Sequence, residues 1–218
     1  MKKLIIFASG SMEGGGSGAM ELVENSHTGI LKAKIVALVS NHPEGGVKKH
    51  AMNLGIPFEY FPGPFTAENY QNIVQKYQAE YISLSGWLKL VKGLDPKKTI
   101  NIHPGPIPQF GGKGMYGHYV HEAVIKAFQE GKVKTSAVTM HFVTEEYDKG
   151  PIFFQYPVLI RSTDDATSLG ERVNKIEHSW QSFITNLVIN EQISWDGIDP
   201  KTLKVPPGYN FHQKITYK

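Results

Sequence analysis

The chain has 218 residues, of which 40% are hydrophobic, 11% aromatic and 20% charged, a composition typical of a globular protein with a sizeable core. Its 23 Lys and Arg against 20 Asp and Glu give a net charge of +3, too small an excess to indicate binding to nucleic acid or membranes. Cysteine is absent, which excludes cysteine nucleophiles, disulfides, zinc ribbons and iron–sulfur clusters.

The first residues resemble a secretion signal, because two lysines precede an apolar run. That run covers residues 4–8, whereas a signal peptide needs about seven or more apolar residues. No stretch approaches the roughly 18 apolar residues of a membrane span. The sequence therefore predicts a soluble, cytoplasmic protein whose first apolar run is a β-strand.

Apolar periodicity and turn residues predict strands that alternate with helices over the first half of the chain. The expected strands are residues 4–8, 34–40, 56–61, 81–85 and 99–103, and the expected helices are residues 17–26, 47–54 and 67–78. This alternation is typical of an α/β fold with a doubly wound, mostly parallel sheet and right-handed crossovers.

The second half predicts a helix at 119–129 and two long strands, 135–143 and 152–160, joined by a polar turn into an antiparallel hairpin. A long helix follows at 165–189, with Thr163 or Asp164 as its cap. Its expected buried stripe is Leu169, Val173, Ile176, Trp180, Phe183, Ile184, Leu187 and Val188. Residues 190–218 read as a polar C-terminal tail, and the whole chain, 1–218, reads as a single domain.

A Gly-rich loop follows the first predicted strand, with the sequence SGSMEGGGSG at residues 9–18. Its backbone N–H groups and the helix start behind it suit a phosphate group. The spacing matches neither the dinucleotide-binding motif nor the P-loop, and a tight turn without a ligand is an equal alternative. Glu13 is expected to face solvent, because an inward carboxylate would repel a phosphate.

Asn101 and His103 stand at the end of a predicted strand, directly before Pro104. Alternation along the strand places both side chains on one face, with Ile102 behind them. A structural role is common for a single histidine. An amide and an imidazole at the carboxyl end of a strand also suit acyl transfer, in which they stabilise negative charge on oxygen and move protons.

Two further groups of polar residues have simpler explanations. Asp148 lies in the polar turn 144–150, where an Asp commonly serves the geometry of the turn. His118, His121 and Glu122 can share one helix face, but without a second cluster they indicate a polar surface. No metal ligand is therefore assigned, and metal catalysis is not expected.

Several segments together resemble the formyltransferase family that uses 10-formyltetrahydrofolate. The main ones, matching in order and spacing, are residues 100–104 (INIHP), 141–144 (HFVT) and 147–152 (YDKGPI). Residues 85–91 (SGWLKLV), 172–178 (RVNKIEH) and 206–209 (PPGY) extend the resemblance over nearly the whole chain. The first loop departs from the family's shorter S-G-x-G-S-N pattern, since it is longer and Gly18, not Asn, follows Ser17.

The resemblance implies a Rossmann-like formyltransferase fold with Asn101, His103 and Asp148 as the catalytic trio. Asn101 and a protonated His103 would stabilise negative charge on the formyl oxygen, while Asp148 would raise the pKa of the imidazole and help to move protons. The implied reaction transfers the formyl group of the co-substrate 10-formyltetrahydrofolate to the amino group of glycinamide ribonucleotide, in de novo purine biosynthesis.

The same resemblance assigns binding residues. The Gly-rich loop in the first half would hold the substrate phosphate, and the second half would hold the folate and the catalytic groups. The phosphate-binding residues would be Gly10, Ser11, Gly16, Ser17 and Gly18, with Asn174 and Glu177 binding the rest of that substrate. The folate-binding residues would be Trp87, Leu88, Lys89, Leu90, Val91, Val143, Thr144 and Glu145. Core packing is a compatible role for the apolar members of this set.

Other functions stay open. The acceptor amine could belong to an amino-sugar nucleotide, or the same trio could hydrolyse 10-formyltetrahydrofolate. A protein of another class, a non-catalytic nucleotide-binding module, could use the same fold, although such a module would not need the catalytic trio. The expected partners are the small-molecule substrates glycinamide ribonucleotide and folate, with neither nucleic acid nor membrane, and a homodimer is allowed.

Overall fold

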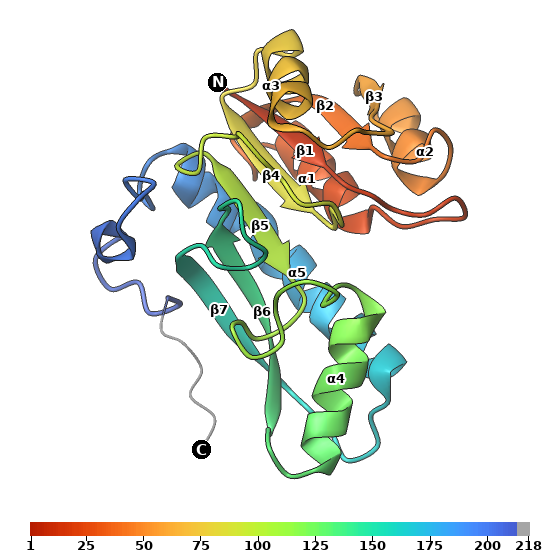
Figure 1. The fold of residues 1–218 in the computed structure, drawn as a ribbon, viewed down its shortest axis with the longest axis vertical. Coiled ribbons are helices and arrows are strands. Elements are labelled where there is room, and N and C mark those ends of the chain that lie inside the picture. The colour runs from red at the N-terminus through yellow and green to blue at the C-terminus, as the bar shows by residue number, and fades with distance from the viewer. Residues whose placement is uncertain (213–218) are drawn as a thin grey trace.

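The computed structural model describes residues 1–212. One seven-stranded sheet has the strand order β3-β2-β1-β4-β5-β6-β7 (Figure 1). The strands are β1 (Lys2–Phe7), β2 (Ala33–Ser40), β3 (Phe58–Tyr60), β4 (Tyr81–Ser85), β5 (Thr99–His103), β6 (Thr135–Phe142) and β7 (Ile152–Leu159). Strands β1 to β5 pair in parallel, and the β5–β6 and β6–β7 pairs are antiparallel. The predicted mostly parallel sheet with a late antiparallel hairpin is confirmed.

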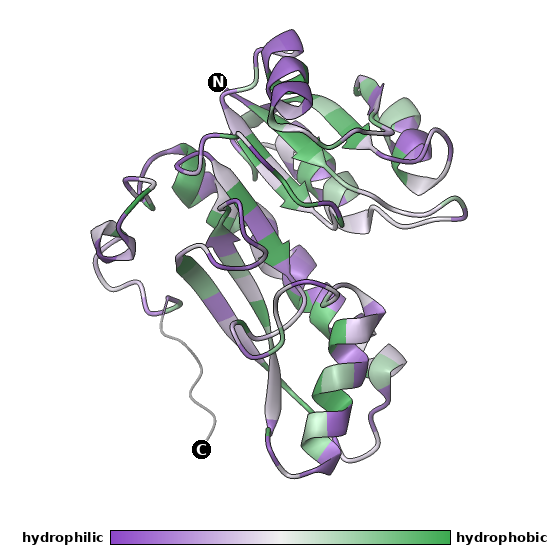
Figure 2. Cartoon of the chain, viewed as in Figure 1, coloured by the Kyte–Doolittle hydropathy of each residue, from purple (hydrophilic) through white to green (hydrophobic). Residues whose placement is uncertain are grey.

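Helices cover both faces of this sheet. One face packs against α1 (Ser17–His27), α2 (Gly46–Asn53), α4 (His118–Gln129) and α5 (Ala166–Ile189), and the other against α3 (Ala67–Lys76). Strand β1 is apolar on both sides because it contributes Leu4 and Ile6 to one core and Ile5 and Phe7 to the other. Figure 2 shows the central strands as mainly hydrophobic and α3 as mainly hydrophilic. Within residues 1–212, no helix has the length and apolar character needed to cross a membrane.

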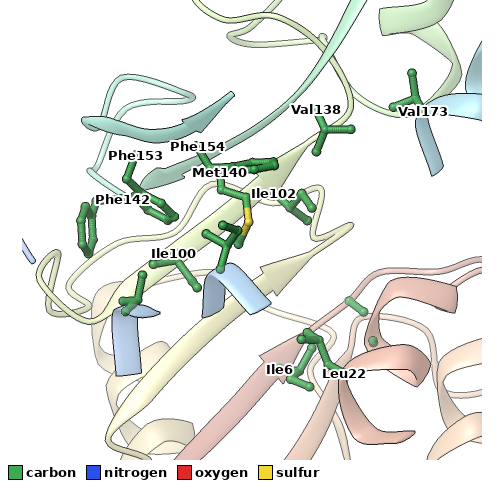
Figure 3. Close-up of a cluster of buried hydrophobic side chains, with 14 of the residues drawn as sticks. Ile6, Leu22, Ile100, Ile102, Val138, Met140, Phe142, Phe153, Phe154 and Val173 are labelled. Carbon is green, nitrogen blue, oxygen red and sulfur yellow. The ribbon is translucent and has the colours of Figure 1, made fainter. Parts of the chain in front are cut away.

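The larger core joins the hairpin to α5 (Figure 3). Its buried side chains include Ile100 and Ile102 from β5, Val138, Met140 and Phe142 from β6, Phe153 and Phe154 from β7, and Val173 from α5. Each such side chain contributes about 1.5–3 kcal/mol when it is fully buried. Because Ile100 and Ile102 of β5 and Met140 and Phe142 of β6 face the helices, the residues between them, Asn101 and His141, and the next one along β5, His103, face the opposite side of the sheet.

Helix α5 begins with a capping box. The Asp165 carboxylate accepts a hydrogen bond from the Ser168 N–H at 2.8 Å, and the Ser168 hydroxyl accepts one from the Asp165 N–H at 3.1 Å. The predicted caps, Thr163 and Asp164, are therefore one or two residues too early. Phe183 also differs from the prediction, because half of its surface is exposed at the edge of the buried stripe.

The predicted polar tail is anchored by apolar side chains. Ile193 and Trp195 are buried in the larger core, and the Trp195 ring lies 5.7 Å from the ring of Phe142. A β-bridge pairs Ser194 with Lys204, and the short 3₁₀ helix η1 (Pro200–Thr202) lies between these two residues. The predicted polar tail therefore begins with a buried apolar segment, and its end at residues 213–218 lies outside the described residues.

Candidate active site

A cavity of about 840 Å³ opens where the carboxyl ends of β1, β4 and β5 meet the β6–β7 hairpin. Ligands of open α/β sheets bind at this end of the strands. In Figure 1 the loops that follow β1 and β5 both emerge at the arrowheads of their strands. The three residues of the predicted trio, Asn101, His103 and Asp148, all line this cavity.

The amide of Asn101 is held by a residue of the neighbouring strand. The register of β5 and β6 places His141 directly opposite Asn101, with 3.1 Å between Asn101 Nδ2 and His141 Nε2. His141 Nδ1 lies 2.7 Å from the carbonyl oxygen of Phe142 and donates to it. In the neutral ring, Nε2 therefore accepts a hydrogen bond from Asn101. The second N–H of the amide remains for a ligand in the cavity.

His103 is almost fully buried, and its two ring nitrogens have different surroundings. Nε2 lies 2.8 Å from the carbonyl oxygen of Phe110 and donates to it, so Nδ1 is the proton acceptor, 3.8 Å from Asp148 Oδ2. Burial lowers the pKa of His103 below its ordinary value, and the opposing effect of Asp148 is smaller. The neighbouring Asp does raise the imidazole pKa as expected, but burial outweighs it and leaves the ring neutral near pH 7.

The backbone at Asp148 turns its carboxylate toward the two histidines. Its φ of 55° lies in the left-handed region, which Asp adopts more readily than most residues. Oδ2 accepts a hydrogen bond from the Gly112 N–H at 2.8 Å, and Oδ1 lies 3.3 Å from His141 Nε2. Burial acts to raise the pKa of Asp148, but His141, His103 and the Gly112 N–H together hold it below its ordinary value. Gly111 permits this approach, since a Cβ there would lie 3.1 Å from the Asp148 Cβ.

His141 contacts both Asn101 and Asp148, although no role was predicted for it from the sequence. A neutral ring accepts from Asn101, whereas a charged ring would donate from Nε2 to Asp148. The only signal in the sequence was the HFVT segment of the family resemblance. The contact itself depends on the antiparallel register of two strands, which the sequence did not reveal.

The predicted phosphate-binding residues gather at one end of the cavity; those lining it are Gly10, Ser11, Gly16, Ser17 and Gly18. Helix α1 begins after Gly16, whose φ is 84°, and no side chain caps its first N–H groups. Such a helix start can bind an anion. The extra residues of the loop form a closed turn, in which the Ser11 N–H donates to the Gly14 carbonyl at 2.7 Å, and Glu13 is exposed as expected.

Two polar residues that the sequence analysis missed stand beside Gly18. A Cβ on Gly18 would lie 2.6 Å from Ser85 Oγ and 3.1 Å from Gln181 Oε1. Gln181 also donates from Nε2 to Ser85 Oγ at 3.1 Å, and both residues line the cavity. This pair fills the space next to the helix start, which explains why glycine follows Ser17 in this chain.

Asn174 and Glu177 lie next to the phosphate end, on the face of α5 that borders the cavity. Asn174 Nδ2 donates to Glu177 Oε2 at 3.5 Å, a long hydrogen bond. Burial raises the pKa of Glu177 to about 7, so its carboxyl group changes charge near neutral pH. It can accept hydrogen bonds from hydroxyl or amino groups of a ligand once it is ionised.

Most of the predicted folate-binding residues line the other end of the cavity. These are Trp87, Leu88, Lys89, Leu90, Val91, Val143 and Thr144, and Glu146 and Tyr147 of the same 143–148 segment line it as well. Trp87 is also part of the smaller core, where its Nε1–H donates to the Tyr70 hydroxyl at 2.9 Å. Glu145 lies outside this cavity and accepts a hydrogen bond from the Gly93 N–H at 3.1 Å. This hydrogen bond connects residues 143–148 to the loop after β4.

His118, His121 and Glu122 do not act as one group. His118 and Glu122 are exposed and lie in contact, with 3.4 Å between Nε2 and Oε1, as expected for a polar surface. His121 is buried, burial lowers its pKa to about 4, and its Nδ1 has no hydrogen-bond partner among the residues that the structure describes. Within residues 1–212, no three His, Cys, Asp or Glu side chains are grouped so that they could hold a metal ion.

The buried His121 predicts a loss of stability in acid. The unfolded chain takes up a proton at the ordinary histidine pKa of about 6.5, whereas folded His121 does so only at about 4. The contribution of neutral His121 to the free energy of unfolding is therefore fully present above the unfolded pKa. It falls as the pH drops through this window, by about 2 kcal/mol between about pH 7 and about pH 5. Urea unfolding of His121→Leu should show a smaller pH dependence than the wild type. His118→Leu is the matched control, and an unchanged dependence in His121→Leu would contradict this prediction.

Known proteins include relatives of this chain. A family model described as formyl transferase matches residues 2–185. The chain belongs to the formyl transferase family. The chloroplastic phosphoribosylglycinamide formyltransferase of Arabidopsis thaliana is 34% identical over 210 residues, which cover 90% of this chain and 69% of that protein.

Two further relatives extend the comparison. The phosphoribosylglycinamide formyltransferase of Bacillus subtilis is 32% identical over 190 residues, which cover 83% of this formyl transferase and 91% of the relative. The crystal structure of glycinamide ribonucleotide transformylase 1 from Symbiobacterium toebii superimposes with a TM-score of 0.80 at 23% identity and covers 94% of each chain. At this identity the structure supports the fold alone, a mixed α/β formyltransferase sheet.

Formyl transferases of this family use 10-formyltetrahydrofolate as co-substrate. The cavity suits such a molecule, because apolar side chains and irregular backbone of residues 87–91 and 143–147 line one end and the polar catalytic groups lie beside them. The co-substrate would place its reactive group near Asn101 and His103 if its ring system occupied that end.

Proposed function

We propose that this chain transfers the formyl group of 10-formyltetrahydrofolate to the amino group of glycinamide ribonucleotide, a step of de novo purine biosynthesis. The observation that supports the proposal best is one continuous cavity with three suitable parts. An uncapped helix start for a phosphate lies at one end and an apolar wall for a pterin at the other, and Asn101, His103 and Asp148 line the same cavity.

The co-substrate supplies an electrophilic formyl carbon when it is bound. Negative charge develops on the formyl oxygen as the acceptor amine attacks, and the free N–H of Asn101 can donate to that oxygen. The hydrogen bond to His141 Nε2 holds the Asn101 amide in place before the reaction begins. This arrangement stabilises the transition state without reorganisation of the site.

Protons must also move. The attacking amine loses a proton, and the folate nitrogen that leaves must gain one. His103 Nδ1 and the Asp148 carboxylate lie 3.8 Å apart. They are placed to hold the proton after it leaves the amine and before it reaches the folate nitrogen, directly or through water. Neutral His103 can accept the proton, and ionised Asp148 then stabilises the resulting imidazolium.

The test is release of tetrahydrofolate, followed by absorbance, from 10-formyltetrahydrofolate with and without glycinamide ribonucleotide. Release that requires the amine supports the proposal. Release without the amine would indicate hydrolysis instead. If neither condition gives turnover, amino-sugar nucleotides are the next acceptors to try, and silence with these as well would favour a binding module.

His141 provides a further prediction from this mechanism. His141→Phe should lower kcat by about 10²-fold, because the Asn101 amide loses the acceptor that orients it. His141→Gln keeps a polar group and should lose less activity. Steady-state kinetics of both variants test this, and wild-type kcat in His141→Phe would show that the contact does not position the catalytic groups.

This function needs small-molecule partners alone. Three features of the sequence analysis remain predictions: a cytoplasmic location, a homodimer and the extent of a single domain over residues 1–218. Cell fractionation, sedimentation and limited proteolysis, in that order, are the direct measurements of these features.

A further inference from the structure

The helix start at the phosphate end is backed by a pair of ionisable residues. His178 of α5 lies between Glu21 and Ser17 of α1, with 3.2 Å from its Nδ1 to Glu21 Oε2 and 3.2 Å from its Nε2 to Ser17 Oγ. Ser17 lines the cavity, whereas His178 stands behind it, outside the lining. His178 can therefore act on a ligand through the Ser17 hydroxyl or by its charge, but not by direct contact.

The direction of the hydrogen bond between His178 and Ser17 decides what Ser17 can offer a ligand. With Glu21 next to Nδ1, the ring carries a proton on that nitrogen. In a neutral ring, Nε2 would then accept the Ser17 hydroxyl hydrogen and turn it away from the cavity. In the charged ring, Nε2–H donates to Ser17 Oγ, and the hydroxyl hydrogen is free to point at an anion.

An anion bound at the phosphate end of the cavity favours the second arrangement, in which the charged His178 ring donates to Ser17 Oγ. The lining residues here are Gly10, Ser11, Gly15, Gly16, Ser17, Gly18, Asn174, Glu177 and Gln181, with neither Lys nor Arg in this part of the described wall. A phosphate would gain from a positive charge close behind Ser17. Burial raises the pKa of Glu21, and His178 opposes that change.

Glu21 is itself held in place from α1. Asn25 Nδ2 donates to Glu21 Oε1 at 3.0 Å and lies 2.8 Å from Ser182 Oγ of α5. The pair therefore sits in a hydrogen-bonded contact between two packed helices, which keeps the His178 ring aligned with Ser17.

We propose that His178, oriented by Glu21, is a positioning residue that directs the Ser17 hydroxyl at the phosphate of the acceptor substrate. The inference rests on the proposed function, because it assumes that this end of the cavity binds a phosphate. The phosphate would then be recognised at this end of the cavity without direct contact to a Lys or Arg side chain.

Kinetics of two variants test the role. His178→Phe should raise KM for glycinamide ribonucleotide by about tenfold to a hundredfold, the range for a lost hydrogen bond to a charged group, with little change in kcat. His178→Gln can still donate an amide N–H to Ser17 and should keep KM near the wild-type value. Glycinamide riboside, which lacks the phosphate, should react equally with the wild type and both variants.

Several results would overturn the proposal. An equal loss with the riboside, a fall in kcat at unchanged KM, or a Gln variant as impaired as the Phe variant would each indicate a structural role. Glu171→Gln, an exposed change on α5, the helix that carries His178, is the control, and thermal unfolding of each variant checks its fold.

Binding of inorganic phosphate separates this inference from the proposed function. It can be followed by phosphorus NMR whether or not glycinamide ribonucleotide is the substrate. Weaker phosphate binding in His178→Phe but not in His178→Gln supports the role of His178 even if the wild type fails to formylate glycinamide ribonucleotide. Equal phosphate binding in all three proteins would overturn it.

Discussion

Asn101→Ala should lower kcat by about 10²–10³-fold, because one donor to the developing negative charge is lost. KM should change little, since the amide acts mainly in the transition state. His141 holds the amide at 3.1 Å in the resting protein, so wild-type catalysis needs no rearrangement to place this donor. Steady-state formyl transfer to glycinamide ribonucleotide measures the loss.

Two controls sharpen this experiment. Asn101→Asp keeps the shape but replaces the donor by a carboxylate, and it should be at least as inactive as the alanine variant. Asn53→Ala changes an exposed amide at the end of α2 and should leave kcat unchanged. If Asn101→Ala retained wild-type kcat, Asn101 would not be the donor to the formyl oxygen.

Asp148→Asn should lower kcat by about 10²–10⁴-fold, the usual contribution of a group that moves protons. The amide keeps the size of the carboxylate but loses the charge that stabilises an imidazolium at His103, 3.8 Å away. Single-turnover measurements of formyl transfer would show whether the chemical step is the one that slows.

The same variant has a second readout that is independent of turnover. Burial lowers the pKa of His103 and Asp148 raises it, so loss of the carboxylate should lower the His103 pKa further. Titration of the His103 ring by NMR measures this shift. A pKa that stays constant or rises in Asp148→Asn would show that the two groups are not coupled.

Local patterns in the sequence predicted most of the fold. Continuous apolar runs predicted the buried strands, and β4 and β5 begin and end at the predicted residues. Errors concentrate where tertiary packing overrides local pattern. Trp195 stands in a polar stretch, yet it is buried because the ring of Phe142 lies against it, and this contact joins residues far apart in the chain.

The candidate site was predicted only in part, because several of its residues come together through tertiary contacts and not through a local pattern. Asn101 and His103 were predictable because strand alternation is a local rule that places them on one face. Asp148 came only from the family resemblance, since its own turn offered a sufficient structural role. Ser85 and Gln181 were missed because their value lies in their contact with Gly18, across three separate segments.

The sequence by itself determined the alternation of strands and helices, the strand end that carries Asn101 and His103, and the Gly-rich loop before α1. These features depend on neighbouring residues, whose geometry the chain sets locally. Only the tertiary structure decided that His141 orients Asn101, that burial keeps His103 neutral, and that His178 stands behind Ser17. Strand register, desolvation and helix packing arise from contacts between distant segments, so no local pattern in the sequence could reveal them.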